Sequence, residues 1–357
     1  MTAKSRAIAR RRMEIQHLWG PGLASPEEVV GWLGALQAQE FAFARWSVGQ
    51  RAGGVDDAAV DGAFDDGLIL RTHILRPTWH FVLPADLPWM LTANGARVQA
   101  RNAYQYRNLG LDDKVFEMTN SVIAKALKGR HLTRKEIAVE LERVGIDSDG
   151  QRLAYIVMRA ELDSVVTSGP RRGKQHTYAR FDERVPKGPT PDPDEALAEL
   201  TRRYFTSRGP ATLKDFVQWA SMTVADAKRG LEMVGPELER EVIDELTYWS
   251  GPGPRPAKRT TTRVNLVQVY DETVMGYSES RSVLQAEIGS RQVPSVNSLM
   301  HPILLDGQMI GHWRPRRGRD SVEIETTFYR PLKPKEQAAL EAEVGRYGRF
   351  LGIPVTA

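Results

Sequence analysis

The sequence contains no cysteine among its 357 residues. Without thiols the chain cannot form disulfides, hold an iron–sulfur cluster, build a thiolate zinc site or use a cysteine nucleophile. Disulfides or metal sites are not needed to stabilise the fold, because 41% of the residues are hydrophobic and a chain of this length can bury a sizeable core. At roughly 150 residues per domain, the length predicts two to three domains.

Long apolar runs are also missing. No stretch approaches the about 18 uninterrupted apolar residues that a membrane span requires. Residues 1–13 are rich in arginine, but Gln16, His17, Gly20 and Pro21 follow where a signal peptide would need an apolar segment. We therefore expect a cytoplasmic protein with no membrane partner.

Neither sign of charge dominates, since 49 Lys and Arg oppose 45 Asp and Glu for a net charge of +4. The distribution is more informative than this sum. Basic side chains gather in three clusters, which are Arg6 with Arg10, Arg11 and Arg12; Arg171 with Arg172 and Lys174; and Arg314 with Arg316, Arg317 and Arg319. One such cluster is most simply solvated surface charge. Three clusters, two of them at predicted hairpin tips, favour contacts with nucleic-acid phosphates.

The familiar cofactor and metal motifs are absent as well. There is no P-loop, no glycine fingerprint for dinucleotides and no His-Glu-x-x-His helix. Of the seven histidines, only His73 and His80 form a close pair, and Pro77 between them excludes a shared helix. Packing or hydrogen bonding to the backbone is the simpler role for both histidines. We expect neither a metal nor a cofactor.

Carboxylates are numerous but not obviously paired for acid–base catalysis. Asp271 and Glu272, at the end of a predicted strand over residues 264–271, are the best acidic candidates. A strand-terminal turn that hydrogen-bonds its own backbone explains the same two residues at least equally well.

Two proline-rich segments, residues 185–194 and 250–257, are predicted to be linkers. Between the start of the chain and the second linker, a capping signal recurs three times, at Ser25–Glu28, Thr133–Glu136 and Thr212–Asp215. Each signal predicts a short helix, followed by a second helix at residues 56–66, 150–162 or 224–234. An earlier helix is predicted each time, at residues 5–18, 114–128 and 194–207.

Hairpins follow the first two helix sets, at residues 68–83 and 165–178. Three helices and a hairpin are typical of the winged-helix form of the helix-turn-helix. After residue 257 the pattern changes to strands at residues 264–271, 303–305, 309–313 and 321–328, with a final helix at 335–347. The turn signals Asp306-Gly307 and Arg317-Gly318 join these strands into a small antiparallel sheet or partial barrel. The predicted fold class is therefore α+β.

One unusual local feature is the pair Gln37 and Gln39, which follows an apolar helix and precedes the aromatic segment Phe41–Trp46. By composition alone, two glutamines at a helix end are usually solvent-exposed filler. Their importance comes from the sequence around them.

Three segments, LQAQEFAFARWSVGQR (36–51), LRTHILRPTWHFVLPADLPWML (70–91) and DGQMIGHW (306–313), resemble winged-helix DNA glycosylases of the AlkZ/YcaQ type. Two further segments, VTSGPRRGKQHTYA (166–179) and YDETVMGYSESR (270–281), resemble that family's second wing and its C-terminal Asp-Glu stretch. The resemblance implies a C-shaped tandem winged-helix molecule. Its expected parts are winged helix 1 (1–113), winged helix 2 (114–190), winged helix 3 (191–257) and a β-rich part with a basic hairpin (258–357).

The resemblance also implies a function. The expected activity is that of a monofunctional DNA glycosylase that excises N7-alkylguanine and unhooks bulky or interstrand-crosslinked adducts, and so gives self-resistance to DNA-alkylating natural products. The resemblance implies that Gln37 and Gln39 are the catalytic pair and that double-stranded DNA containing alkylated purines is the partner, with a nucleoid location and no obligate protein partner. The expected DNA-binding residues are Thr72, His73, Arg76, Thr78, His80, Arg171, Arg172, Lys174, Arg314, Arg316, Arg317 and Arg319.

Two other classes of function remain open on sequence grounds. A non-enzymatic winged-helix regulator would account for the repeated motif and the basic hairpins, but it would leave the glutamine pair without a role. A resistance protein that sequesters a ligand would need an aromatic pocket, for which Trp79, Trp89 and Phe81 are candidate linings. These three aromatics are more simply explained as core residues.

Overall fold

The computed structural model describes residues 3–189, 192–253, 261–285 and 300–356. The first part of the chain builds a small three-stranded sheet within a set of helices. Ser25 caps the second helix by accepting from the backbone N–H of Glu28, as its capping signal predicts. The elements are α1 (Ala3–Ile15), α2 (Pro26–Leu33), β1 (Ala35–Gln37), α3 (Phe41–Gly49), α4 (Asp57–Asp65), β2 (Leu70–His73) and β3 (Trp79–Val82).

The second part repeats helices and a wing. Thr133 and Glu136 form the predicted capping box, and the hairpin at residues 165–178 is confirmed. The elements are α5 (Leu87–Asn108), α6 (Asp113–Ala126), β4 (Leu132–Thr133), α7 (Arg134–Glu142), α8 (Gly150–Leu162), β5 (Val166–Arg172), β6 (Gln175–Arg180) and α9 (Phe181–Arg184). Helix α5 was not predicted, because its pattern is only weakly amphipathic and contains Gly95.

The third part follows the same plan, with α10 (Pro193–Arg208), α11 (Leu213–Ala220), α12 (Val224–Val234), a 3₁₀ turn η1 (Gly235–Glu237), β7 (Glu239–Ile243) and β8 (Leu246–Ser250). The β7–β8 hairpin was not predicted. Its turn residues, Asp244 and Glu245, have φ values of 47° and 67°. The sequence therefore lacks the glycine that usually marks such a turn.

The C-terminal part is a five-stranded sheet in the order β13-β12-β11-β10-β9, antiparallel except where β12 pairs with β13. Its elements are β9 (Val264–Leu266), α13 (Glu272–Met275), a 3₁₀ turn η2 (Arg281–Leu284), β10 (His301–Leu305), β11 (Gln308–Arg317), β12 (Val322–Phe328), α14 (Pro334–Leu351) and β13 (Val355–Thr356). The strand predicted over 264–271 is wrong beyond Leu266, because Asp271 caps helix α13 instead.

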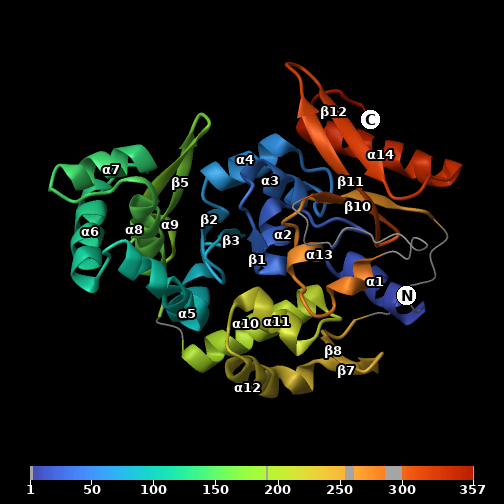
Figure 1. Cartoon of the computed structure of the whole chain (residues 1–357), viewed down its shortest axis with the longest axis horizontal. Coiled ribbons are helices and arrows are strands. Elements are labelled where there is room, and N and C mark those ends of the chain that lie inside the picture. The colour runs from blue at the N-terminus through green and yellow to red at the C-terminus, as the bar shows by residue number, and fades with distance from the viewer. Residues whose placement is uncertain (1–2, 190–191, 254–260, 286–299, 357) are drawn as a thin grey trace.

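These parts surround the sheet β1–β3. Figure 1 shows α6–α8 at one end of the molecule, the C-terminal sheet at the other, and α10–α12 along the lower side. One apolar core joins α2, α3 and α4 to the C-terminal sheet, and a second joins β1–β3 to α10 and α11. Helices α6–α8 enclose a third core. The α+β fold class is confirmed, and the division at residues 113, 190 and 257 stays a prediction.

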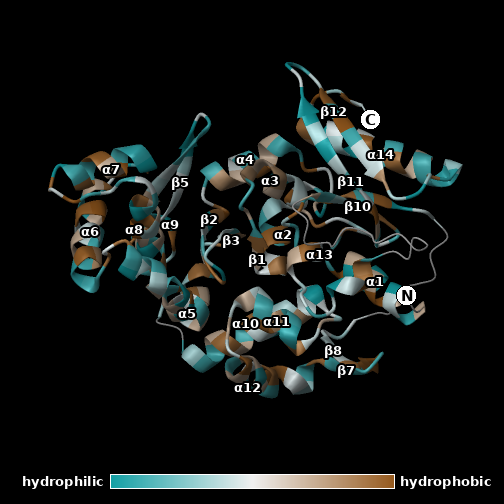
Figure 2. Cartoon of the chain, viewed as in Figure 1, coloured by the Kyte–Doolittle hydropathy of each residue, from teal (hydrophilic) through white to brown (hydrophobic). Residues whose placement is uncertain are grey.

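The distribution of apolar residues agrees with these three cores. The tip of the β11–β12 hairpin is hydrophilic in Figure 2, whereas apolar colour lies on elements that face the cores. Over the described ranges, no helix is both long enough and apolar enough to cross a membrane. The same residues contain no group of three or more His, Cys, Asp or Glu side chains arranged to hold a metal ion.

Candidate active site

The glutamine pair lies between helices α2 and α3, as its place in the sequence indicates, but Gln37 belongs to strand β1, which was not predicted. Helix α2 ends at Leu33, and Gly34 turns the chain with a positive φ of 70° that favours glycine. Strand β1 then pairs antiparallel with β3, with Gln37 opposite His80. The Ala38 N–H donates to the Trp79 carbonyl at 2.7 Å, which continues the pairing one residue further toward Gln39.

The side chain of Gln37 is held in one orientation. It is 2% exposed, and its Oε1 accepts a hydrogen bond of 2.8 Å from Nη2 of Arg76. A guanidinium can only donate, so this contact identifies the amide oxygen and fixes which way the amide faces. Arg76 also donates to the Trp219 carbonyl at 2.9 Å, which anchors it to helix α11.

Gln39 has different surroundings. Its side chain is half-buried, and among the described residues its buried Oε1 has no hydrogen-bond donor. The backbone beside it is fixed, because Arg71 donates to the Ala38 carbonyl at 2.9 Å and to the Gln39 carbonyl at 3.4 Å. An unpaired buried acceptor costs about 1–3 kcal/mol, so this oxygen is suited to a polar group that binds there.

Neutral histidines and charged arginines surround the pair. Burial and the nearby Arg76 hold the pKa of His80 well below its usual value. Its Nδ1 lies 3.0 Å from the Thr78 carbonyl and its Nε2 lies 3.2 Å from Arg76, so the proton belongs on Nδ1. Burial lowers the pKa values of Arg71 and Arg76 to about 10, which leaves both cationic at neutral pH.

The predicted DNA-binding residues of the first hairpin lie mostly inside the protein. Thr72, His73 and His80 are buried, and His73 pairs with Glu161 of α8 and packs against Trp79 with ring centroids 4.4 Å apart. His73 and Arg76 thus connect the hairpin to α8, α11 and β1. Thr78 is half-buried, and its Oγ1 has no partner within the described residues. Their role in binding DNA stays a prediction.

The two basic hairpins carry most of their charge at the surface, partly paired with carboxylates, although Arg171 is half-buried. In the β5–β6 wing, Arg171 pairs with Asp61 of α4, and Arg172 pairs with Glu136 at 2.8 Å, while Lys174 is exposed. In the β11–β12 hairpin, Arg314 and Arg316 both pair with Glu325, and Arg317 and Arg319 are exposed. The wing approaches the pair, because the Arg171 guanidinium lies 5.2 Å from the centroid of the Phe41 ring, two positions after Gln39. Within the described residues, no contact joins the cluster on the β11–β12 hairpin to the glutamines.

Asp271 and Glu272 are both fully buried, and neither is placed as a solvent-facing acid or base. Asp271 accepts from the Thr273 N–H at 2.9 Å, the backbone-capping role considered from sequence. Burial alone would raise the pKa of Asp271, but the Arg51 guanidinium, bonded to it at 2.7 and 2.8 Å, holds that pKa below its usual value. Glu272 accepts from the backbone N–H of Gln37 at 2.9 Å.

Sequence reasoning missed Arg208 and Trp219, which also bond to Glu272. No local signal identifies them, because their partner lies 64 and 53 positions further along the chain. Arg71, which donates to the backbone carbonyls of Ala38 and Gln39, was also not predicted, although it adjoins the expected DNA-binding residue Thr72.

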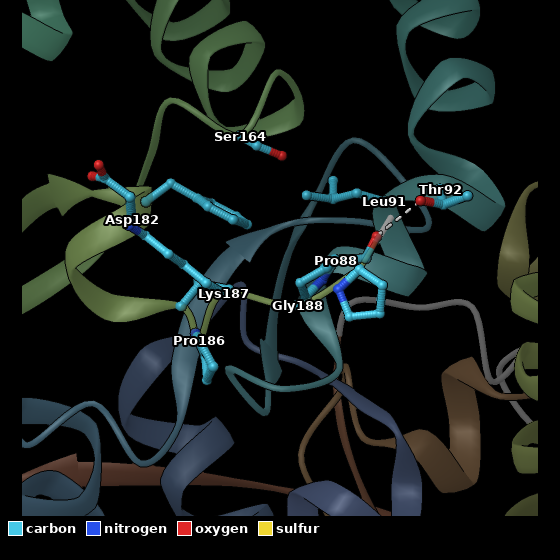
Figure 3. Close-up of a pocket in the computed structure, with 11 residues that line it drawn as sticks. Pro88, Leu91, Thr92, Ser164, Asp182, Pro186, Lys187 and Gly188 are labelled. Carbon is cyan, nitrogen blue, oxygen red and sulfur yellow. Dashed lines mark hydrogen bonds between the residues drawn. The ribbon is translucent and has the colours of Figure 1, made fainter. Parts of the chain in front are cut away.

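A separate open pocket of about 610 Å³ lies between the start of α5 and the segment after α9 (Figure 3). Pro88, Leu91 and Phe181 give it apolar walls, and Asp182 and Lys187 add charge. None of the predicted site residues lines it. The aromatics proposed for a ligand-sequestering pocket, Trp79, Trp89 and Phe81, do not line it either, and Phe81 is fully buried in the core.

Three comparisons relate the chain to known proteins. A family model described as DNA glycosylase AlkZ-like matches residues 30–350. The chain is 24% identical, over 374 aligned residues, to the interstrand DNA cross-link repair glycosylase of Streptomyces sahachiroi, covering 99% of this chain and 98% of that protein. The solved structure of Streptomyces sahachiroi DNA glycosylase AlkZ is similar with a TM-score of 0.76 at 22% identity, covering 100% of both chains. The similarity of fold therefore extends over the full length.

Proposed function

The chain belongs to the AlkZ-like family of DNA glycosylases, and from that premise we propose that it excises N7-alkylguanine from duplex DNA with Gln37 and Gln39 as its catalytic residues. Water attacks C1′ of the sugar, the C1′–N9 bond breaks with its electrons going to the base, and the water's proton passes to solvent. An abasic site and a neutral free base are the products.

The observation that carries this proposal is the contrast between the two amide oxygens. Gln39 Oε1 is buried and, within the described chain, has no donor, so it can accept from the attacking water or face the positive charge developing on the sugar. Gln37 Oε1 is oriented by Arg76 and retains a second lone pair for the same purpose. Placement of these dipoles, rather than proton transfer, is the chemistry that an amide pair can supply.

The substrate's own charge explains why amides suffice. Guanine alkylated at N7 is already cationic, so it leaves without being protonated. Two histidines around the pair, His80 opposite Gln37 and His176 against Phe41, are poor proton donors at neutral pH. Burial lowers the pKa of His80 well below its usual value and that of His176 to about 4. A neutral base, which needs an acid in order to leave, is therefore disfavoured as a substrate.

We further propose that the enzyme unhooks interstrand crosslinks and so protects a producer of DNA-alkylating natural products. The similar Streptomyces sahachiroi protein is named for crosslink repair. A base crosslinked to the opposite strand cannot swing fully out of the duplex, so it must be approached in place. The surface cations of the β5–β6 wing and the β11–β12 hairpin would bind the surrounding phosphates.

A test of the proposal is incubation of excess enzyme with a duplex that contains one N7-methylguanine, with free base measured by chromatography. We expect release of N7-methylguanine and none of uracil or 8-oxoguanine from matched duplexes. A duplex crosslinked between two guanine N7 atoms should separate into single strands on a denaturing gel. Efficient release of uracil would refute the argument from substrate charge, and no release from any duplex would favour a DNA-binding regulator.

A further inference from the structure

Strand β1 is at the edge of its sheet, and its open edge is not left to solvent. The strand order is β1-β3-β2, so only one side of β1 pairs with another strand. On the other side, the Ala35 carbonyl accepts from Nη2 of Arg208 at 2.7 Å and the Gln37 N–H donates to Oε1 of Glu272 at 2.9 Å. Two side chains thus occupy the positions where a neighbouring strand would offer its backbone groups.

These two side chains form one buried ion pair. Nε and Nη2 of Arg208 donate to Oε2 of Glu272 at 3.0 and 2.7 Å, and the Trp219 indole N–H donates to the same oxygen at 2.9 Å. Arg208 also donates to the Leu33 carbonyl at 2.7 Å, just before the turn into β1. Both charged side chains are fully buried.

We propose that the Arg208–Glu272 ion pair positions strand β1 and thereby sets where the Gln37 side chain lies. Arg208 and Glu272 are then positioning residues for base excision. This positioning role rests on the proposed catalytic role of Gln37, because the ion pair acts by holding the backbone of Gln37 in register.

The energetics support a positioning role over a purely stabilising one. Removing two charges from water is costly, and a buried ion pair often stabilises a fold no more than apolar residues of similar size. This pair nevertheless supplies directed hydrogen bonds to the backbone on both sides of Leu36. Catalysis is sensitive to such placement, since a shift of about 1 Å in a catalytic group can lower the rate about a hundredfold.

The sharpest variant is Glu272→Gln, which keeps the shape of the side chain. An amide has one accepting oxygen, but Glu272 accepts on Oε1 from Gln37 and on Oε2 from Arg208 and Trp219. Whichever way the amide of this variant faces, its NH₂ group points at another hydrogen-bond donor, so at least one of these hydrogen bonds is lost. We expect the single-turnover rate of N7-methylguanine release at saturating enzyme to fall about ten- to a hundredfold, with the dissociation constant for DNA unchanged.

A second, milder variant is Trp219→Phe, which removes one donor to Glu272 and keeps an aromatic ring. A smaller loss of rate, about two- to tenfold, is expected from the loss of this single positioning hydrogen bond. The matched control is Glu343→Gln on α14, another buried carboxylate, which accepts from Gln50 and does not contact β1. The control should keep the wild-type rate per folded molecule.

The deciding measurement repeats each variant in a Gln37→Ala background. If the ion pair acts through Gln37, Glu272→Gln and Trp219→Phe cause no further loss there. Losses that multiply with that of Gln37→Ala, or an equal loss in Glu343→Gln, would overturn the positioning role while leaving the catalytic role of Gln37 intact. Full activity of Gln37→Ala itself would instead refute the proposed function, and the positioning role with it.

Discussion

At the scale of single residues, Gln37 and Gln39 are two positions apart but have unlike partners. Arg76 binds the oxygen of Gln37, while within the described chain the oxygen of Gln39 has no donor. Removing each side chain therefore has different consequences for stability. Loss of Gln37 leaves a buried guanidinium without one of its acceptors, whereas loss of Gln39 removes an acceptor that no described donor uses.

We predict that Gln37→Ala and Gln39→Ala each lower base release about a hundredfold, the scale of losing one positioned transition-state dipole. DNA affinity should hardly change, since amides contribute little to binding driven by phosphates. Only Gln37→Ala should also lower the free energy of unfolding, by about 1–3 kcal/mol. Single-turnover kinetics and urea denaturation check both expectations. Full single-turnover activity of either variant would remove that residue from the catalytic pair.

At the scale of elements, the β11–β12 hairpin is the clearest candidate for contact with DNA. Arg314 and Arg316 share one carboxylate, Glu325, whose pKa these guanidiniums hold below its usual value. Glu325 is therefore ionised at neutral pH and offsets part of the positive charge on this hairpin. The cations nearer the tip, Arg317 and Arg319, are exposed.

We predict that replacing Arg316 and Arg317 together with Ala weakens DNA binding and lowers the salt dependence of the binding constant by about two, one for each lost phosphate contact. Glu325→Gln should act in the opposite direction, because it frees two guanidiniums without removing them. Fluorescence anisotropy titrations between low and moderate salt measure both slopes. An unchanged slope in the arginine variant would show that this hairpin does not contact phosphates.

At the scale of the whole molecule, neutral histidines are built into separate regions. Burial lowers the pKa of His301 to about 4, where its Nδ1 accepts from the Val269 N–H at 3.1 Å. Burial also lowers the pKa of His176 on strand β6 to about 4. The His176 ring packs against Phe41 with ring centroids 4.7 Å apart. His80 is shifted in the same direction. The folded protein thus disfavours protonation that the unfolded chain accepts near pH 6.5.

This difference sets the sign of a pH effect on stability. Between about pH 6.5 and 4 the unfolded chain binds more protons at these histidines, so the free energy of unfolding falls as the pH falls through that window. We predict a lower thermal midpoint at pH 5 than at pH 7.5. In His301→Asn, the side-chain oxygen can still accept from the Val269 N–H. The thermal midpoint of this variant should fall less between pH 7.5 and pH 5 than that of the wild type. An equal drop in the variant would mean that His301 does not contribute.

The sequence by itself determined the features that depend on neighbouring residues. Helices α2, α7 and α11 begin where Ser25, Thr133 and Thr212 cap them, because the cap and the N–H it accepts from are three positions apart. The winged-helix resemblance was also visible, and the family match confirms it. Absent cysteine excluded whole classes of chemistry without reference to any fold.

Tertiary structure alone decided the surroundings of the candidate catalytic pair. Arg76 and Glu272 reach Gln37 from 39 and 235 positions away, and Arg208 reaches its carboxylate partner from 64 positions away. A local pattern cannot encode such contacts, because they form only when distant segments pack and bury their polar groups against one another. For the same reason the sequence did not predict that Gln37 lies in a strand. Strand β1 is held by pairing with β3 on one edge and by the Arg208–Glu272 ion pair on the other.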